Sequence, residues 1–552
     1  MGHSPDAVLG VIGLRGLRPF TGFQFILDDH RYTSDPRIQE SGHLWDYFTN
    51  YVWAQYVGGP PSFYRPIFAI WLRLNFMLAD LSPWGWHLLS IAKHLAVGAL
   101  LGLLIWQLLR DSGAALAGAS LFVLHPAQTE SVSWVSVPDP LMSAGLLGAL
   151  LLYLRYAGYR LSPKTPETKS RKKSSQQAGP SPLWMIASGL AYFAALLAKE
   201  TAVIFPVLVF AIALLNSGVP ATSNSKETGF DFSFRLRKAI GHTAPFVCVT
   251  VLYLLLRLNA LGGKLDVSTQ QLGLRTLLLS WPATLWFYFK VMLWPVKSYS
   301  FADPTLVEQF SARSVLLPLF GLACCGLILT AASVYAWRKA QRESTAHEPA
   351  GIKIAVITGI LLLVLPLLLT LNLNGLNPGD FLHGRYTYLP LAGLMLLIAT
   401  AWHLAKKFRV VLICSVGLLT ALFTKFTFAQ EVQWKDDETV FATAHQLAPH
   451  NAPVARNLAD SFVRAALQLQ DEGRCNEAIP VFDRVIKDYP DDWYAWAGRG
   501  VCYVQLKDLV KAEESLHRAG DISHNSQVIQ QWRELRAQMG LPNSGSTSNS
   551  NY

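Results

Sequence analysis

The sequence predicts an all-α protein: a multi-pass transmembrane helical bundle of about 10–11 helices followed by a C-terminal α-solenoid. Of its 552 residues, 51% are hydrophobic and only 15% are charged, whereas about 25% are charged in an average soluble domain. Long apolar runs alternate with short basic loops over most of the chain, and a helical repeat appears near its end. This composition excludes a purely soluble globular protein and a disordered one.

The apolar runs approach the length of about 20 residues that a membrane-spanning helix needs. The run at 274–295 is also apolar, but its three Trp residues favour a helix that lies at the outer membrane interface or re-enters there. Spanning helices are predicted at 84–109, 113–134, 139–157, 183–198, 200–216, 241–257, 314–336, 353–371, 387–404 and 410–428.

Lys and Arg residues predict the orientation of the bundle. One set of loops carries more than twice as many of them as the other set, and basic loops stay in the cytoplasm. This anchoring accounts for the net charge of +10, so we expect membrane lipids and no nucleic acid as partners. The outward segments are 20–83, 125–139, 199–200, 258–313, 372–386 and everything after 428, whereas the Ser/Lys/Gln-rich stretch 161–182 is predicted to be a flexible cytoplasmic loop.

The N-terminal segment is too short to span a membrane. Residues 7–14 are apolar, but Arg15 and Arg18 follow, and no standard signal peptide is recognisable. Residues 20–83 therefore reach the outer side in one of two ways. Either the N-terminus is translocated together with helix 84–109, or a first helix precedes Met1, which is the interpretation we favour. The predicted domains are a membrane domain at 1–430, a repeat domain at 431–540 and a disordered tail at 541–552.

The repeat domain shows a spacing of 34 residues. The positions that it relates are Phe462 and Trp496, Ala466 and Gly500, Leu469 and Tyr503, Ala478 and Ala512, Phe482 and Leu516, and Val485 and Ala519. This is the pattern of a tetratricopeptide repeat, which packs two antiparallel helices per unit and binds proteins or peptides. Another helical hairpin bundle is the alternative, and 436–448 and 525–538 are predicted to cap the array. The six cysteines are scattered and form no CxxC, so we expect neither a disulfide framework nor a structural zinc site.

Polar residues that are costly near a membrane gather in the outward segments. Adjacent carboxylates such as Asp28 and Asp29 repel each other, which can raise one pKa towards that of a useful base. Each residue also has an ordinary explanation: a helix N-cap for the aspartates, lipid headgroups for Arg65, and a mutual ion pair for Lys199 and Glu200. The other candidates are His125, Glu130, Asp139, Arg385 and Tyr386.

The placement of these groups on one side predicts a shared outward cavity. Carboxylates there suit general-base chemistry, and cations suit a phosphate leaving group. Together they indicate transfer from a lipid-linked phosphate donor.

Several strings, in this order, resemble the transmembrane and tetratricopeptide-repeat O-mannosyltransferases and their bacterial relatives, within the type C superfamily of membrane glycosyltransferases. They are FILDDHRY (25–32), FYRPIFAIWLRLNFML (63–78), WGWHLLSIAKHL (84–95), LFVLHPAQTESVSWVSVPDPLMSA (121–144), LLAKETAVIFPVL (196–208), HGRYTYLPLAGL (383–394) and the tail from Trp434. The resemblance implies about eleven membrane helices and an acidic pair in the first outward loop.

The resemblance also assigns roles to residues. Asp28 and Asp29 would be catalytic, one of them as the base that takes the proton of the acceptor hydroxyl. The donor would be a polyprenyl-phosphate sugar, typically mannose, and the acceptor hydroxyl a protein Ser or Thr. Arg65, Lys199 and Arg385 would bind the donor phosphate. Supporting roles fall to His125, Glu130, Asp139, Glu200 and Tyr386. No cofactor and no metal ligand is singled out, and a divalent-metal requirement is left open.

The chain departs from the family pattern at two positions and at its start. Val137 stands where the family usually has Arg, Gly384 stands where it often has an acid, and the first helix is missing or truncated. A non-catalytic scaffold whose repeats recruit extracytoplasmic proteins is therefore the alternative. A lipid-linked-sugar transporter would need an internal membrane repeat, and none is visible. We expect a bacterial inner membrane with periplasmic repeats, or the endoplasmic reticulum with lumenal repeats.

Overall fold

The computed structural model confirms the all-α fold class. It describes residues 22–54, 63–159, 181–215, 232–263, 271–296, 306–342, 348–376 and 382–542. Within these ranges every regular element is helical, and the chain divides into one compact unit ending at Asp436 and a second beginning at Asp437. The N-terminal run at 7–14, most of the predicted loop 161–182 and nearly all of the predicted disordered tail lie outside the described residues.

Seven helices in the described part of the first unit are long and apolar enough to cross a membrane. The segments are Pro83–Leu109 (α6), Phe232–Ala260 (α12), Leu274–Leu293 (α13), Ala312–Arg342 (with α14, Leu317–Arg342), Ala350–Leu369 (within α15, Glu348–Leu369), Gly384–Leu404 (with α16, Tyr388–Leu404) and Lys406–Trp434 (with α17, Arg409–Glu431). By length and composition they make the chain a multi-pass membrane protein. The interfacial position of the run at 274–295 and the cytoplasmic side of the bundle stay predictions.

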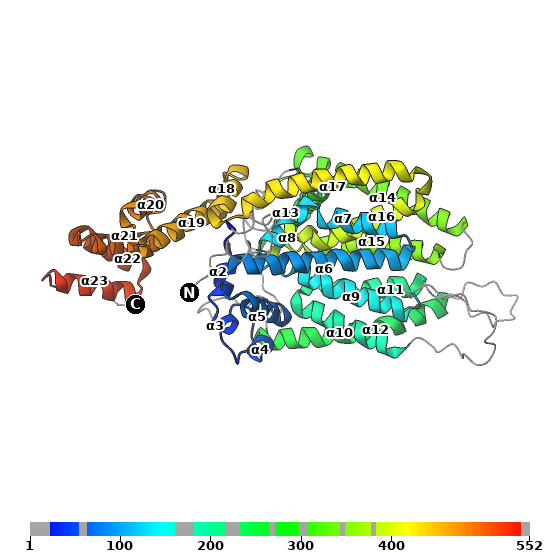
Figure 1. The fold of residues 1–552 in the computed structure, drawn as a ribbon, viewed down its shortest axis with the longest axis horizontal. Helices are drawn as coiled ribbons and strands as arrows, with labels where there is room; N and C mark the ends of the chain where they lie inside the picture. The colour runs from blue at the N-terminus through cyan, green and yellow to red at the C-terminus, as the bar shows by residue number, and fades with distance from the viewer. Residues whose placement is uncertain are drawn as a thin grey trace, which may run out of the picture. The chain divides into compact units, whose positions relative to one another are not determined.

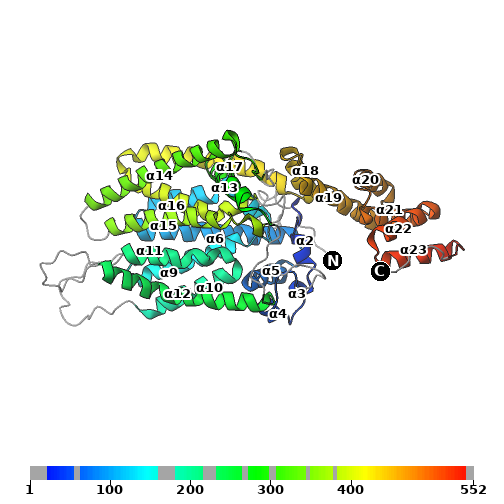
Figure 2. The same cartoon turned by 180° about the vertical axis from the view of Figure 1, so that it is seen from behind.

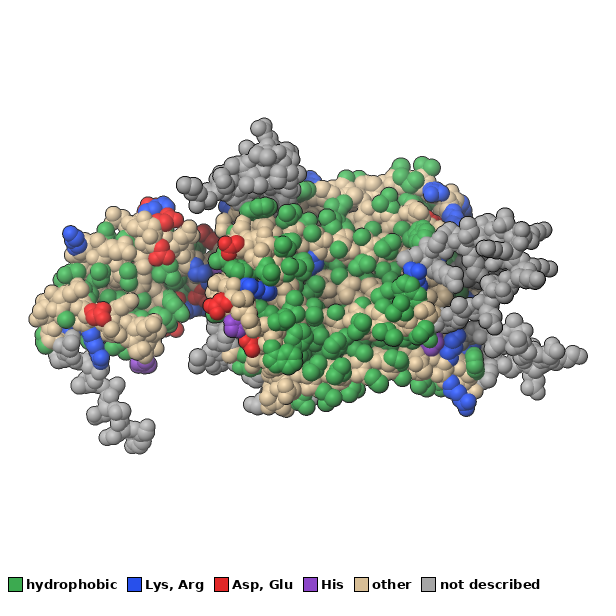
Figure 3. Space-filling view, turned by 60° about the horizontal axis from the view of Figure 1, so that its bottom comes forward, with side chains coloured by type: hydrophobic (Ala, Val, Ile, Leu, Met, Phe, Trp, Pro, Cys, Tyr) green, Lys and Arg blue, Asp and Glu red, His purple; other side chains and the backbone are tan. Residues whose placement is uncertain are grey.

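Shorter apolar helices complete the bundle. They are α5 (Pro66–Ala79), α7 (Ser112–Val123), α9 (Asp139–Tyr156), α10 (Pro182–Ala198) and α11 (Phe205–Leu215). Helix α6 packs against α5, α7, α9, α15 and α16, so it lies inside the bundle (Figures 1 and 2). Helices α15 and α16 approach so closely that a Cβ at Gly393 would lie 2.6 Å from the carbonyl oxygen of Gly359. Figure 3 shows hydrophobic side chains spread over the flank of the bundle and charged ones towards its ends.

The predicted helix at 113–134 was wrong in its second half. Helix α7 ends at Val123, and the chain then forms two short turns, η2 (Pro126–Gln128) and α8 (Thr129–Ser133). The physical reason is Pro126, which pushes the preceding His125 into an extended conformation. The break leaves a non-helical turn, Trp134–Pro138, between α8 and α9.

Three short helices of the first predicted outward loop and the start of α5 gather at one end of the bundle (Figure 1). They are α2 (Asp29–Thr33), α3 (Pro36–Gln39), α4 (Asp46–Thr49) and the start of α5. Tyr32, Phe68 and Trp86 form a buried cluster there that also contains Val135 of the 134–138 turn. This cluster holds the loop against α6 and against the turn.

The second unit is an array of antiparallel helices. It contains α18 (Asp437–Leu447), α19 (Ala452–Asp471), α20 (Cys475–Asp488), α21 (Trp493–Gln505), α22 (Leu509–Ser523) and α23 (Ser526–Gln538), each packed on the next. A Cβ at Gly500 would come within 2.8 Å of the Leu516 side chain, which explains the small residue at this repeat position. Cys475 and Cys502 form a disulfide between α20 and α21, which the spacing of the cysteines did not predict.

Candidate active site

The polar residues of the candidate site meet at the turn that joins α8 to α9. We call residues 134–139 the anchor turn, because side chains from separate segments of the chain bind it. Asp29 comes from α2, Lys93 from α6, Lys199 from the end of α10, and Arg385 from the short helix η6 (Gly384–Thr387). The structure therefore brings Asp29, Asp139, Lys199 and Arg385 together within one unit of the fold, and the shared outward cavity stays a prediction.

The two adjacent aspartates have different environments. Asp29 is fully buried, and its Oδ1 accepts the N–H of Ser136 at 3.0 Å while its Oδ2 accepts the N–H of Ile26 at 3.2 Å. Burial raises the pKa of Asp29 to about 7, although these hydrogen bonds act in the opposite direction. Asp28 is half-buried and stands at the N-cap position of α2 without a side-chain capping bond. Asp29 thus fastens α2 to the anchor turn, and Asp28 is the more accessible carboxylate.

Arg65 forms a two-pronged ion pair with Glu200. Its Nη2 lies 2.7 Å from Glu200 Oε1, and its Nε donates to Oε2 at 3.2 Å. The guanidinium also covers the Phe63 ring at 4.1 Å. This fork joins the start of α5 to the start of the turn η3 (Glu200–Ile204).

Lys199 pairs with Asp139, and the pair is buried. The Lys199 Nζ lies 2.7 Å and 2.6 Å from the two carboxylate oxygens, and it faces the Tyr386 ring at 5.1 Å. The ordinary explanation from sequence, a mutual ion pair of Lys199 with Glu200, is wrong. Because the two residues are neighbours, their side chains diverge, and each finds a distant carboxylate or cation instead.

Glu130 is the centre of a third charged group. Its carboxylate accepts the backbone N–H and an Nη1–H of Arg385, each at 3.2 Å, and lies 3.0 Å from Nδ1 of His383. Burial alone would raise the pKa of Glu130, but His383 and Arg385 hold it below its usual value. A Cβ at Gly384 would lie 3.1 Å from the same carboxylate, so an acid at this departure from the family pattern would face Glu130.

Comparisons with known proteins identify a repeat family and several relatives of the chain. A family model described as tetratricopeptide repeat matches residues 463–523. Protein O-mannosyl-transferase TMTC1 of Homo sapiens is 25% identical over 507 residues, which cover 85% of this chain and 53% of the relative. Protein O-mannosyl-transferase Tmtc1 of Drosophila melanogaster is 25% identical over 469 residues, or 71% of this chain and 52% of the relative. Protein O-mannosyl-transferase TMTC3 of Mus musculus is 24% identical over 532 residues, or 89% and 52%.

The chain is a relative of the transmembrane and tetratricopeptide-repeat O-mannosyltransferases. It spans about half the length of the curated relatives that it matches. No solved structure matches the chain.

His125, predicted as a supporting residue by resemblance to this family, lies outside the charged groups. Its Nδ1 accepts the N–H of Ala127 at 3.2 Å, its Nε2 lies 3.0 Å from the carbonyl oxygen of Met292, and its ring meets the Phe423 ring at 4.6 Å. Burial lowers the pKa of His125 to about 4, so the ring is neutral. The structure gives it the role of fixing the break at Pro126.

Lys93 is a candidate residue that the sequence analysis missed. Its side chain is buried at 5% exposure, and its Nζ donates to the carbonyl oxygen of Val137 at 3.3 Å and faces the Trp71 ring at 5.5 Å. The other candidates lie in predicted outward loops, whereas Lys93 lies inside the predicted spanning helix at 84–109. A charge in such a helix is itself a signal of function.

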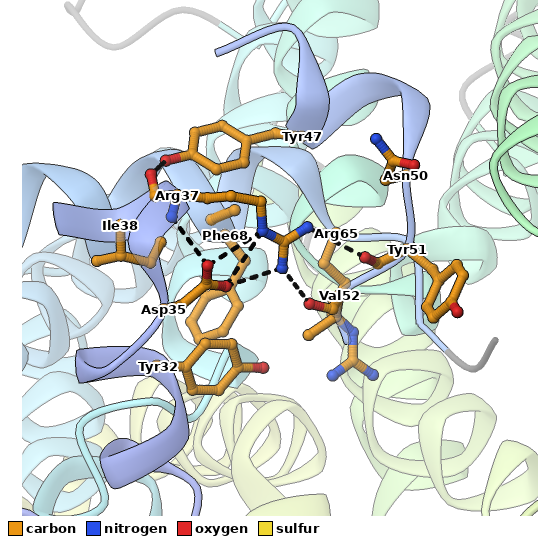
Figure 4. A pocket seen from close by; sticks show the side chains of 11 residues that line it. Tyr32, Asp35, Arg37, Ile38, Tyr47, Asn50, Tyr51, Val52, Arg65 and Phe68 are labelled. Carbon is orange, nitrogen blue, oxygen red and sulfur yellow. Dashed lines mark hydrogen bonds and ion pairs between the residues drawn. The ribbon is translucent and has the colours of Figure 1, made fainter. Parts of the chain in front are cut away.

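A small pocket lies beside the charged groups, between the loop helices and α5. Figure 4 shows Tyr32, Asp35 and Arg37 on one side and Arg65 on the other. Arg37 closes the loop by binding Asp35 at 2.8 Å and the carbonyl oxygen of Val52 at 2.5 Å. Among the described residues, no group of three or more His, Cys, Asp or Glu side chains is placed to hold a metal ion.

Proposed function

We propose that this protein transfers a sugar, mannose by analogy with its relatives' names, from a polyprenyl-phosphate carrier to a protein Ser or Thr hydroxyl. The observation that carries the proposal is the convergence of Asp29, Lys93, Lys199 and Arg385 on the anchor turn. Carboxylates and cations from separated segments are buried together there at the cost of desolvation, which is expected at a site for an anionic substrate. The similarity to proteins named protein O-mannosyl-transferases, over 85% of the chain for the human relative, supports the same reaction.

In the proposed reaction, Asp28 takes the proton of the acceptor hydroxyl, because it is the more accessible carboxylate of the pair. The acceptor oxygen forms a bond to the anomeric carbon as the bond from that carbon to the phosphate oxygen breaks. The configuration inverts, and polyprenyl phosphate leaves. Asp29 holds α2, and so Asp28, against the anchor turn.

The site would face the extracytoplasmic side, as the distribution of Lys and Arg predicts. The disulfide between Cys475 and Cys502 supports this side for the repeat unit, because disulfides persist in oxidising compartments such as the periplasm or the lumen. The repeat unit would hold the acceptor protein or another protein partner, as tetratricopeptide arrays generally do.

A transfer assay with the full chain in membranes, using polyprenyl-phosphate mannose and an acceptor peptide, tests the proposal. Asp28→Asn should lower the rate of transfer by about 100-fold or more. Asp46→Asn is the matched control in the same loop, because Asp46 is 44% exposed and pairs with His43, three residues away. Unchanged transfer in Asp28→Asn and in Asp29→Asn would overturn the catalytic assignment of this pair. No transfer by the wild type would overturn the proposed reaction and favour the non-catalytic scaffold.

A further inference from the structure

Lys93 is a buried ammonium group on a membrane-length helix. It lies ten residues after Pro83 in α6, which places it about 15 Å along the helix. A charged side chain at such a position is costly unless other groups compensate it. Its presence therefore requires an explanation from its surroundings.

The described protein groups compensate Lys93 only in part. One hydrogen bond, of 3.3 Å to the carbonyl oxygen of Val137, and the Trp71 ring are its direct contacts. Asp139 and Asp29 are the carboxylates that act on it electrostatically. Both oxygens of Asp139 already hold Lys199, and the two oxygens of Asp29 accept backbone N–H groups.

The balance of charge distinguishes Lys93 from the other cations of the site. Arg65, Lys199 and Arg385 each contact a carboxylate directly. Lys93 shares the single charge of Asp139 with Lys199. When Asp29, the other carboxylate that acts on Lys93, holds its proton, these buried side chains therefore carry one excess positive charge. An anion that enters the site would neutralise this excess.

We propose that Lys93 binds the phosphate of the lipid-linked donor. This inference rests on the proposed function. It assigns the main contact with the phosphate to Lys93 in place of the ion-paired Arg65, Lys199 and Arg385. Lys93 and Asp29 bind consecutive residues of the anchor turn, Val137 and Ser136, so the phosphate ligand and the helix that carries the base share one attachment point.

This position suits the movement of charge in the reaction. The acceptor hydroxyl loses its proton to Asp28, and its oxygen forms a bond to the anomeric carbon. The bond between that carbon and the phosphate oxygen breaks, and its electron pair stays on the phosphate oxygen. The phosphate changes from a diester with one negative charge to a monoester with a second ionisable oxygen. Lys93 stabilises this additional negative charge, while Lys199 stays with Asp139.

The test measures binding of the phosphate group apart from catalysis. The full chain in nanodiscs is titrated with a polyprenyl monophosphate and with the uncharged polyprenol of the same chain length, and affinity is read from the shift in thermal unfolding. In the wild type the monophosphate should stabilise the protein and the polyprenol should not. Lys93→Met should weaken monophosphate binding by about tenfold or more, and Lys93→Arg should keep most of it.

Lys339→Met is the matched control. Lys339 also donates from a membrane-length helix to a backbone carbonyl, that of Leu404 at 2.5 Å, but it lies away from the anchor turn, so its removal should leave binding unchanged. Equal binding in wild type and Lys93→Met, or no preference of the wild type for the monophosphate, overturns the inference. If binding behaves as expected but no sugar is transferred, only the proposed reaction fails.

Discussion

Asp139 should matter more to the stability of the bundle than the lysine with which it pairs. Asp139→Asn leaves two buried ammonium groups, Lys199 and Lys93, without a carboxylate nearby that is free to neutralise them. Lys199→Met instead leaves Asp139 next to Lys93, and the two charges balance. The two halves of one ion pair are therefore expected to differ in the cost of their removal.

The magnitude follows from the geometry. At the 2.6 Å separation of Lys199 Nζ and Asp139 Oδ2, an effective dielectric constant of about 20 gives an attraction of roughly 6 kcal/mol, before desolvation. Removing one partner of a buried pair costs about 3–5 kcal/mol, because the other charge stays buried. We expect Asp139→Asn to reach this range and Lys199→Met to cost about 1–2 kcal/mol, since Lys93 takes over the carboxylate.

Thermal unfolding of the full chain in detergent, followed by the fluorescence of its 17 Trp residues, measures the difference. The Tm of Asp139→Asn should lie below that of Lys199→Met. Adding Lys93→Met to Asp139→Asn should recover part of the loss, because one of the two uncompensated ammonium groups is removed. The reasoning is refuted if Lys199→Met is the more damaging change, or if Lys93→Met brings no recovery.

Three further predictions concern the first loop and the repeat unit. Because burial raises the pKa of Asp29 from 3.8 to about 7, the folded protein keeps a proton that the unfolded chain releases. The stability contributed by Asp29 should therefore fall by about 1.4 kcal/mol per unit as pH rises from about 4 to about 7. The Tm of the wild type relative to Asp29→Asn should decline over this range, and a constant difference would contradict the assignment. Arg65→Glu should lower the Tm, and combining it with Glu200→Arg should restore at least half of that loss. If the Tm loss of the double variant equals the sum of the losses of the two single variants, the ion pair with contacts of 2.7 Å and 3.2 Å contributes nothing to stability. The disulfide closes a separation of 27 residues, so replacing Cys475 and Cys502 by Ser should cost the repeat unit about 3.5 kcal/mol. Limited proteolysis of the full chain should cut the repeats faster in this variant, and reductant should speed cleavage only in the wild type.

Most of the fold could be predicted from the sequence because its signals are local. A membrane helix is recognised from the polarity of some 20 consecutive residues, and a tetratricopeptide unit from small and aromatic residues at a fixed spacing. The prediction failed at 113–134, where Pro126 ends the helix although the following residues are largely uncharged. Composition averaged over a window hides such a single-residue break.

The pairings within the site could not be predicted in the same way. Arg65 lies 135 residues from Glu200, and Glu130 lies 255 residues from Arg385. Without the fold, the nearest opposite charge in the sequence is the natural partner, so the sequence favours a pair of Lys199 with Glu200. Lys93 was missed for a related reason, since one lysine hardly changes the polarity of the 27-residue helix around it.

The long sequence separations of the charge pairs have a consequence for how the protein is made. At a synthesis rate of about 5–20 residues per second, Lys199 is made roughly 3–12 s after Asp139, because it follows 60 residues later. Arg385 is made roughly 10–50 s after Glu130. During this interval a carboxylate that ends in the interior of the bundle has no permanent counter-ion. The N-terminal half must therefore stay next to water or the insertion machinery until η6 and α16 have been synthesised, and the bundle closes late rather than helix by helix.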